Sequence, residues 1–345
     1  MFVSDYYYKK EGITLKKTVN WFLFLLIAGI VTVFVACGSE TSEGERNAGD
    51  DYPSKPITYM IPFDAGGQSD LEARRQQPFL KEELGQSINI TYKPGGGGSV
   101  GWAELVQQEP DGHYMAGINI PHIILQPLSQ EDTGYETEQI EPVAVFQATP
   151  IGLAVMKDSD IETMEDFVAA AKENPGQITV AGSGTYSGHH LAFQQLQNLA
   201  DIDIQYVSFT GAASQVQGFL GGNTTAILAN SNDLVSYKDE LTILAIGSEE
   251  RFEPLPDVPT FKELGYDMTA SIDRGVAVPP GTPADIVQKL EDAFLKIAND
   301  STVQQQMTEE GFEPKALGAE ETKAYIEEKT AEYKPLLEEL QSSEN

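Results

Sequence analysis

Residues 56–98 read PITYMIPFDAGGQSDLEARRQQPFLKEELGQSINITYKPGGGG, and this stretch decides the fold class. Residues 56–63 are rich in β-branched and aromatic side chains and end before a pair of glycines, which predicts a strand. A helix is expected over residues 71–84, interrupted or kinked at Pro78. Residues 88–92 predict a second strand. A strand, a helix and a strand in this order indicate a βα unit and a parallel sheet.

The same alternation continues along the chain. The further expected elements are helices over residues 100–108, 164–174 and 189–199, strands over 114–120 and 178–181, and a long extended stretch over 143–156 that Pro150 crosses. Thr163 is expected to cap the second of these helices. Short strands that alternate with helices predict an α/β fold. In such folds ligands lie at the carboxyl ends of strands, in loops that lead into helices.

Glycine is concentrated in those loops. Three glycine groups, at residues 66–67, 95–98 and 182–188, each follow an expected strand and precede an expected helix. Glycine lets the backbone approach a ligand, and the helix behind presents unpaired N–H groups and the positive end of its dipole. These loops therefore predict an anion site built from backbone amides. The run 95–98 is not followed by the Lys-Ser/Thr of a phosphate loop, so it is either a plain turn or part of a pocket wall.

The first 51 residues predict export and a lipid anchor. Four lysines precede a 16-residue apolar run, shorter than the ~20 residues of a spanning helix, and Cys37 follows it. This is the pattern of a secretory signal over residues 1–36, and residues 34–37 (FVAC) resemble a bacterial lipobox with the lipid on the cysteine. Residues 37–51 are polar and predict a flexible tether. An uncleaved anchor helix is the alternative, and it too would place the body outside the cytoplasm.

Composition and charge exclude several classes of protein. Cys37 is the only cysteine, so neither an intramolecular disulfide nor a cysteine-based zinc cluster can form. The formal net charge of −31 repels nucleic acid and anionic lipid head groups. The four histidines show no metal-binding spacing. We therefore expect no metal, no cofactor and no nucleic-acid partner, and a body held together by its hydrophobic core.

Two charged residues are candidate ligand contacts, and each has a structural alternative. Asp70 lies near an expected helix start, where it caps the helix, recognises a hydroxyl or amino group of a ligand, or does both. Arg274 either pairs with Asp273 or another acid, or clamps a ligand carboxylate through two of its nitrogens. Residues 182–190 lack the G-x-S-x-G nucleophile motif and mark no third member of a triad, so hydrolase chemistry is not expected. His190 is expected to orient its loop.

Eight segments, in order, carry a family signature. They are YPSKPI at 52–57, PFDAGGQSD at 62–70, KPGGGG at 93–98, PDGHY at 110–114, NPG at 174–176, residues 184–191, RFEPLPDVPTFKEL at 251–264 and PPGTP at 279–283. Together they resemble the solute-binding receptors of tripartite tricarboxylate transporters, also called the Bug family. The resemblance runs from Tyr52 to about Tyr333, and it rests on the number and order of the segments.

This resemblance implies a two-lobed periplasmic-binding-protein fold of type II, with a ligand cleft between the lobes and two hinge crossings. Lobe one is expected to comprise residues 52–149 and 246–345, and lobe two residues 150–245. No catalysis is implied. The family implies an extracytoplasmic receptor that delivers a small organic carboxylate to a separate two-subunit membrane permease. We expect the receptor to be a monomer. The alternative is a ligand sensor subunit for a membrane signalling kinase.

The resemblance also places the site. In the family, backbone N–H groups and ordered waters from two pocket loops hold a ligand carboxylate, and these loops correspond to residues 63–70 and 183–190. Tyr186, Phe209 and Arg274 depart from the family's common residues. Arg274 together with Tyr186 implies a second polar anchor, and hence a di- or tricarboxylate ligand. The predicted ligand-binding residues are Phe63, Gly66, Gly67, Ser69, Asp70, Asn119, Ser183, Gly184, Tyr186, Ser187, His190, Phe209 and Arg274.

Overall fold

The computed structural model describes residues 51–343. The predicted signal segment 1–36, the predicted lipidation site Cys37 and nearly all of the predicted tether lie outside the described residues. None of the described helices is both long enough and apolar enough to cross a membrane. The described residues all belong to one compact unit, and the fold below is that of this unit.

Six strands form the first sheet, in the order β11-β4-β10-β3-β1-β2. Their bounds are β1 Ile57–Ile61, β2 Ile88–Tyr92, β3 Tyr114–Ile120, β4 Glu141–Ala148, β10 Asp273–Val278 and β11 Glu313–Leu317. β1 pairs in parallel with β2 and β3, as predicted. β10 pairs antiparallel with β3 and β4, and β11 pairs antiparallel with β4. The expectation of a parallel sheet is therefore wrong for these strands, because β10 enters directly from the second sheet without a crossover helix.

Five strands form the second sheet, in the order β7-β6-β8-β5-β9. Their bounds are β5 Ile151–Met156, β6 Thr179–Ser183, β7 Gln205–Phe209, β8 Ala226–Asn230 and β9 Leu241–Ile246. β6 pairs in parallel with β7 and β8, whereas β5 pairs antiparallel with β8 and β9. Both sheets are thus mixed, each with a parallel part built from βα units.

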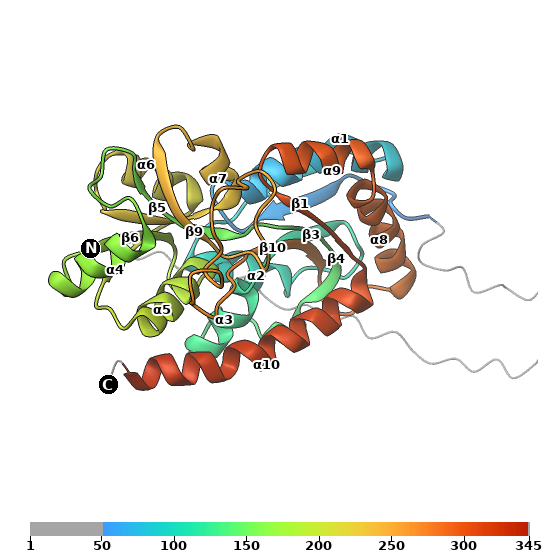
Figure 1. The fold of residues 1–345 in the computed structure, drawn as a ribbon. Coiled ribbons are helices and arrows are strands. Elements are labelled where there is room, and N and C mark those ends of the chain that lie inside the picture. The colour runs from blue at the N-terminus through green and yellow to red at the C-terminus, as the bar shows by residue number, and fades with distance from the viewer. Residues whose placement is uncertain (1–50, 344–345) are drawn as a thin grey trace, which may run out of the picture. The chain divides into compact units, whose positions relative to one another are not determined.

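The described part of the chain contains ten α-helices. They are α1 Gln68–Leu84, α2 Ser99–Leu105, α3 His122–Ser129, α4 Met164–Glu173, α5 Gly188–Ala200, α6 Ala212–Leu220, α7 Ser231–Ser236, α8 Ala284–Ala298, α9 Ser301–Glu309 and α10 Ala319–Ser343; two short 3₁₀ turns lie at Gly96–Gly98 and Thr137–Gln139. Figure 1 shows α1, α8 and α9 on the side of the first sheet and α4, α5 and α6 on the side of the second, with the long α10 along the lower edge.

Several element predictions are confirmed and others need correction. Thr163 caps α4, since its hydroxyl accepts the N–H of Asp166. α1 begins at Gln68, earlier than predicted, and runs through Pro78 without interruption. The extended stretch over 143–156 is two strands rather than one, because the chain leaves the first sheet after β4 and enters the second at β5.

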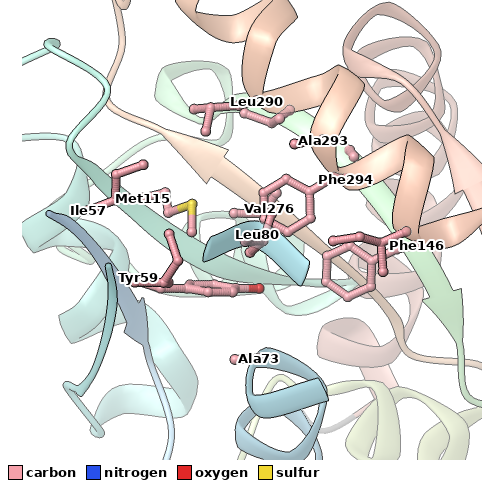
Figure 2. Packing of buried hydrophobic residues seen from close by; sticks show 14 of the residues in the cluster. Ile57, Tyr59, Ala73, Leu80, Met115, Phe146, Val276, Leu290, Ala293 and Phe294 are labelled. Carbon is pink, nitrogen blue, oxygen red and sulfur yellow. The ribbon is translucent and has the colours of Figure 1, made fainter. Parts of the chain in front are cut away.

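Each sheet has its own buried core. In the first, the rings of Phe146 and Phe294 stack at 5.9 Å between centroids, and Tyr59 meets Phe294 edge-on at 6.2 Å. Figure 2 shows these rings close together. In the second, Phe167 and Phe261 are fully buried. Burying one such side chain stabilises the fold by roughly 1.5–3 kcal/mol. Each sheet with its own core is called a half of the protein below, and each core holds the loops of its half in place.

The chain passes between the sheets at two places that run side by side. Thr149 and Ile272 exchange two backbone hydrogen bonds of 3.0 Å, and Pro150 forms a bridge with Ser271. After β9 the chain stays with the second sheet, because Phe261 and Ile272 belong to its core. It then enters β10.

Candidate functional site

A small cavity lies where the carboxyl ends of strands from both sheets meet. It encloses about 50 Å³, well below the roughly 300–1,000 Å³ of sites for drug-sized molecules. Seven of the predicted residues line it: Phe63, Gly67, Ser69, Asn119, Ser183, Gly184 and Arg274. These seven residues come from segments that are far apart in the chain, and the fold brings them to one cavity.

The other predicted residues lie beside or behind the cavity. Tyr186 and Phe209 line a neighbouring groove of about 540 Å³, which shares Phe63 and Gly184 with the cavity. Gly66 lines a third hollow, at the start of α1. The remaining three residues, Asp70, Ser187 and His190, are not among the lining residues of the cavity. Their contacts indicate that they shape the two loops.

Asp70 holds the first loop. Its carboxylate accepts the N–H of Gly66 at 2.8 Å, the hydroxyl of Tyr92 at 2.7 Å and Nε of Arg74 at 2.8 Å. Burial opposes ionisation of this carboxyl, but these hydrogen bonds outweigh it and hold the pKa of Asp70 below its ordinary value. The N-cap of α1 is Gly67, so the capping alternative for Asp70 is wrong. The residue fixes the loop from within the first turn.

Ser187 and His190 hold the second loop. The hydroxyl of Ser187 accepts the N–H of His190 at 3.2 Å and donates to the carbonyl of Gly184 at 3.0 Å. The N–H of Tyr186, whose φ of 53° lies in the left-handed region, donates to Nδ1 of His190 at 3.2 Å. Burial lowers the pKa of His190 to about 4, so its ring is neutral and can accept this hydrogen bond. The imidazole thus stabilises an unusual backbone conformation.

Ser183 and His189 form a close pair at the cavity wall, with Oγ and Nδ1 2.5 Å apart. Burial, and then the nearby Arg274, lower the pKa of His189 to about 3. Such a ring is a poor general base, since it cannot hold a proton near neutral pH. The side chain of Asn230 approaches the ring, but Asn230 Oδ1 and His189 Nε2 both lack a hydrogen-bond partner. The contact with His189 can orient the Ser183 hydroxyl toward a ligand.

Arg274 brings a buried positive charge to the cavity. Its side chain is almost fully buried, and its Nη1 and Nη2 donate to Thr149 Oγ1 and Gln68 Oε1. Burial lowers its pKa to about 10, which leaves it charged at neutral pH. The predicted alternative, an ion pair with Asp273 or another acid, is not found among the described residues. The carboxylate of Asp273 instead binds Lys315 at 2.8 Å and the Tyr325 hydroxyl.

Several buried polar atoms around this cavity have no partner in the described part of the protein. They are Nε of Arg274, Nδ1 of His122 and Oδ1 of Asn230, all on lining residues. A buried polar atom without a hydrogen bond costs about 1–3 kcal/mol, so most such atoms are paired in native proteins. Their concentration at one cavity indicates a place for a polar molecule with both donors and acceptors around it.

Two helix N-termini also point to an anion. Gly67, Gln68 and Ser69 at the start of α1 and the run 211–214 at the start of α6 line the cavity. The first N–H groups of a helix have no intrahelical acceptor and lie at the positive end of its dipole. Because α1 belongs to the first sheet and α6 to the second, the two donor groups face the cavity from both halves.

The glycine run 95–98 serves both as a turn and as a wall. All four glycines have positive φ, and Gly97 lines the cavity. A Cβ on Gly98 would lie 2.4 Å from the Trp102 ring, so only glycine fits there. The run 95–98 is therefore both a turn and part of the pocket wall, the two alternatives that the sequence left open.

Sequence reasoning missed several lining residues. They are His122, Thr210, Gly211, Ala212, Ala213, Ser214, Asn230 and Ile272. Asp64 and Gln68 also line the cavity; they lie in the predicted pocket loop 63–70 but were not predicted individually. Asn230 ends a short apolar strand, AILAN, directly before a helix, and this signal could have identified it. The loop 210–214 follows β7 and opens α6 in the same manner.

Several known proteins are similar to this chain over most of its length. The profile of the tripartite tricarboxylate transporter family receptors matches residues 73–341. The protein from the gbd 5′ region of Cupriavidus necator is 28% identical over 319 residues, covering 92% of this chain and 97% of its own. A protein from the TAR-I ttuE-ttuC′ intergenic region of Agrobacterium vitis is 30% identical and covers 78% of this chain and 79% of its own.

Solved structures show the same fold. One, described as a periplasmic transporter, is 28% identical, with a TM-score of 0.79 over 83% of this chain and 97% of that one. Two further structures come from R. palustris: Rpa4515 with adipate, at 22% identity and a TM-score of 0.80, and MatC with bound malate, at 23% identity and 0.76. They cover 84% and 82% of this chain and 99% of their own. The predicted α/β solute-binding fold is thus confirmed.

Proposed function

The chain belongs to the tripartite tricarboxylate transporter receptor family, and from this premise we propose that it captures a small organic carboxylate outside the cytoplasm and delivers it to a membrane transporter. The proposed transporter partner is the separate two-subunit permease of such systems. The proposed mechanism is binding and closure, without a chemical step.

One observation carries the proposal. Arg274 is a buried cation that lines the cavity, and its Nε has no partner in the described part of the protein. A carboxylate oxygen at Nε would complete its hydrogen bonding and neutralise its charge where water is largely excluded. The N–H groups at the starts of α1 and α6 offer a second anion position in the same cavity.

Two anion positions favour a ligand with two carboxylates. One carboxylate would bind Arg274 and the other would bind the backbone N–H groups near Ser69 and Ala213. Adipate and malate, which occupy two structures of the same fold, are both dicarboxylates. We therefore propose a di- or tricarboxylate, held by Ser183, Gly184 and Asn119 in addition to Arg274.

Opening and closing of two lobes would admit this ligand. We propose that the lobes meet at Thr149–Pro150 and at Ser271–Asp273, where the two connections run side by side. We propose a return crossing later than the predicted residue 246; the packing of Phe261 and Ile272 in the core of the second sheet supports this proposal. Closure would strengthen each hydrogen bond to the ligand by excluding water.

We further propose that a lipid on Cys37 holds the receptor, as a monomer, at the outer side of the membrane, after removal of residues 1–36. Replacement of Cys37 by Ser should then move the protein from the membrane fraction to the soluble fraction after export. A Cys37→Ser protein that stays with the membrane would contradict a lipid anchor.

Titration calorimetry with matched acids tests the proposed ligand class. Malate and adipate should bind more tightly than acetate and butyrate, and Arg274→Gln should weaken the dicarboxylates by at least roughly tenfold. Arg251→Gln is the matched control, since Arg251 is exposed and pairs with Glu263 at 3.0 Å outside the cavity. Equal affinity for mono- and dicarboxylates, or an unchanged affinity in Arg274→Gln, would contradict the proposal.

A further inference from the structure

The side chain of Gln68 joins the two halves of the protein. Its Oε1 accepts a hydrogen bond from Nη2 of Arg274, and its Nε2 donates to Oδ1 of Asn232 and, at 3.0 Å, to Oδ2 of Asp233. Gln68 and Arg274 lie on α1 and β10, with the first sheet. Asn232 and Asp233 lie on α7, which contacts strands of the second sheet. One amide therefore spans the boundary.

The charged groups on the two sides of Gln68 favour an amide over a charged side chain of similar length. The oxygen of Gln68 faces a guanidinium, and its nitrogen faces a carboxylate, so both hydrogen bonds are assisted by a charge. Gln68 is buried and Asp233 is half-buried. Burial raises the pKa of Asp233 to about 6, so the group is ionised at neutral pH. A glutamate at position 68 would repel Asp233, and a lysine would repel Arg274.

Two other side-chain contacts between the halves do not involve Arg274. The hydroxyl of Ser231 donates to the carbonyl of Gly311 at 2.6 Å, and Nε2 of Gln126 donates to the carbonyl of Thr185 at 3.0 Å. Gln68 differs from both because it shares the guanidinium that lines the cavity. A molecule bound at Nε of Arg274 would orient the same planar group that Gln68 binds at Nη2.

We propose that Gln68 is a latch: a positioning residue that couples the state of Arg274 to closure of the two lobes. A carboxylate at Arg274 fixes the guanidinium plane, the guanidinium fixes the amide of Gln68, and the amide then holds Asn232 and Asp233 of the other lobe. The coupling to a carboxylate rests on the proposed function, whereas the latch between the lobes can be tested without any ligand.

The first test measures the distance between the lobes. Spin labels are placed at Phe79→Cys on α1 and Leu199→Cys on α5, two exposed side chains, in a Cys37→Ser background. With no carboxylic acid ligand added, Gln68→Met should shift the electron–electron distance distribution to larger distances than in the labelled protein that keeps Gln68. Gln68→Asn, which is too short to reach both partners, should do the same.

Gln77→Met is the matched control. Gln77 lies on the same helix, and its Nε2 donates to the carbonyl of Ile88 at 2.7 Å, within the first sheet. Gln77→Met removes the same amide group, but the hydrogen bond that it removes lies within the first sheet. Its distance distribution should match that of the parent protein, and circular dichroism should show that all three variants are folded.

The second test measures dissociation of malate and adipate by stopped flow. Gln68→Met should release either acid roughly tenfold faster, while Gln77→Met should not change the rate. Unchanged lobe distances and unchanged release rates in both Gln68 variants would overturn the latch and leave the receptor function standing. Widened lobes in a protein that binds no carboxylate would support the latch and contradict the receptor function.

Discussion

Protonation of His190 should weaken the fold in acid, and the size of this effect follows from the structure. The neutral ring accepts the N–H of Tyr186 at 3.2 Å and lies 4.7 Å from the Tyr206 ring. Burial lowers the pKa of His190 from 6.5 to about 4. An imidazolium has no acceptor for Tyr186 and carries a charge in a largely buried place. The folded protein therefore resists protonation that the unfolded chain accepts.

The sign of the pH effect follows from the two pKa values. Between about pH 4 and pH 6.5 the unfolded chain binds a proton at His190 that the folded protein does not bind. The free energy of unfolding therefore falls as the pH falls through this window, and it is unaffected above it. Between about pH 7.5 and pH 4.5 the loss from this residue amounts to about 2.5 kcal/mol.

The assay is urea unfolding of the parent protein and His190→Asn at half-unit steps from about pH 4.5 to pH 7.5. The asparagine oxygen can still accept the Tyr186 N–H, but it does not titrate. The two stabilities should therefore converge by about 2.5 kcal/mol toward the acid end. Gln197→Asn is the control, since it loses a bond to the Ile204 N–H without removing a titrating group, and its curve should run parallel to the parent. Parallel curves for His190→Asn would refute the reasoning.

Three further substitutions have expected outcomes. Asp70→Asn removes a charge that binds the Gly66 N–H at 2.8 Å, so it should lower stability by about 2 kcal/mol and weaken carboxylate affinity; full affinity in calorimetry would contradict a role in shaping the loop. Thr163→Ala removes the cap of α4 and should lower the free energy of unfolding by about 1 kcal/mol without changing affinity, as urea unfolding and calorimetry can check. Gly98→Ala places a Cβ 2.4 Å from Trp102 at a φ of 105°, and it should destabilise by about 3 kcal/mol; a loss below about 1 kcal/mol in urea unfolding would show that the loop adjusts freely.

Local patterns were enough to predict much of the fold. β1, β2 and β3 lie where the apolar runs predicted them, because branched and aromatic side chains favour strands whatever surrounds them. The direction of β10 was not predictable in this way, since it depends on where the chain re-enters the first sheet. The glycine loops were found because glycine is concentrated there, and Gly66, Gly184 and the run 95–98 do have positive φ, which favours glycine.

Only part of the site was predictable, because some of its residues act through contacts between distant segments of the chain. Gly67, Ser183 and Arg274 stand out locally, as loop residues after strands or as a rare cation. Gln68 does not, because its partner Asp233 lies 165 residues away and its role exists only after both halves have folded. Asp70 was predicted as a site residue, but its role was not. Its carboxylate accepts a hydrogen bond from the hydroxyl of Tyr92, 22 residues further on, and no local pattern indicates this contact.

A crystal structure of the protein with malate tests the central claim most directly. One carboxylate of malate should lie within hydrogen-bond distance of Arg274 Nε, and the other should lie at the N–H groups that begin α1 and α6. A malate molecule bound elsewhere, with Arg274 Nε still unpaired, would contradict it.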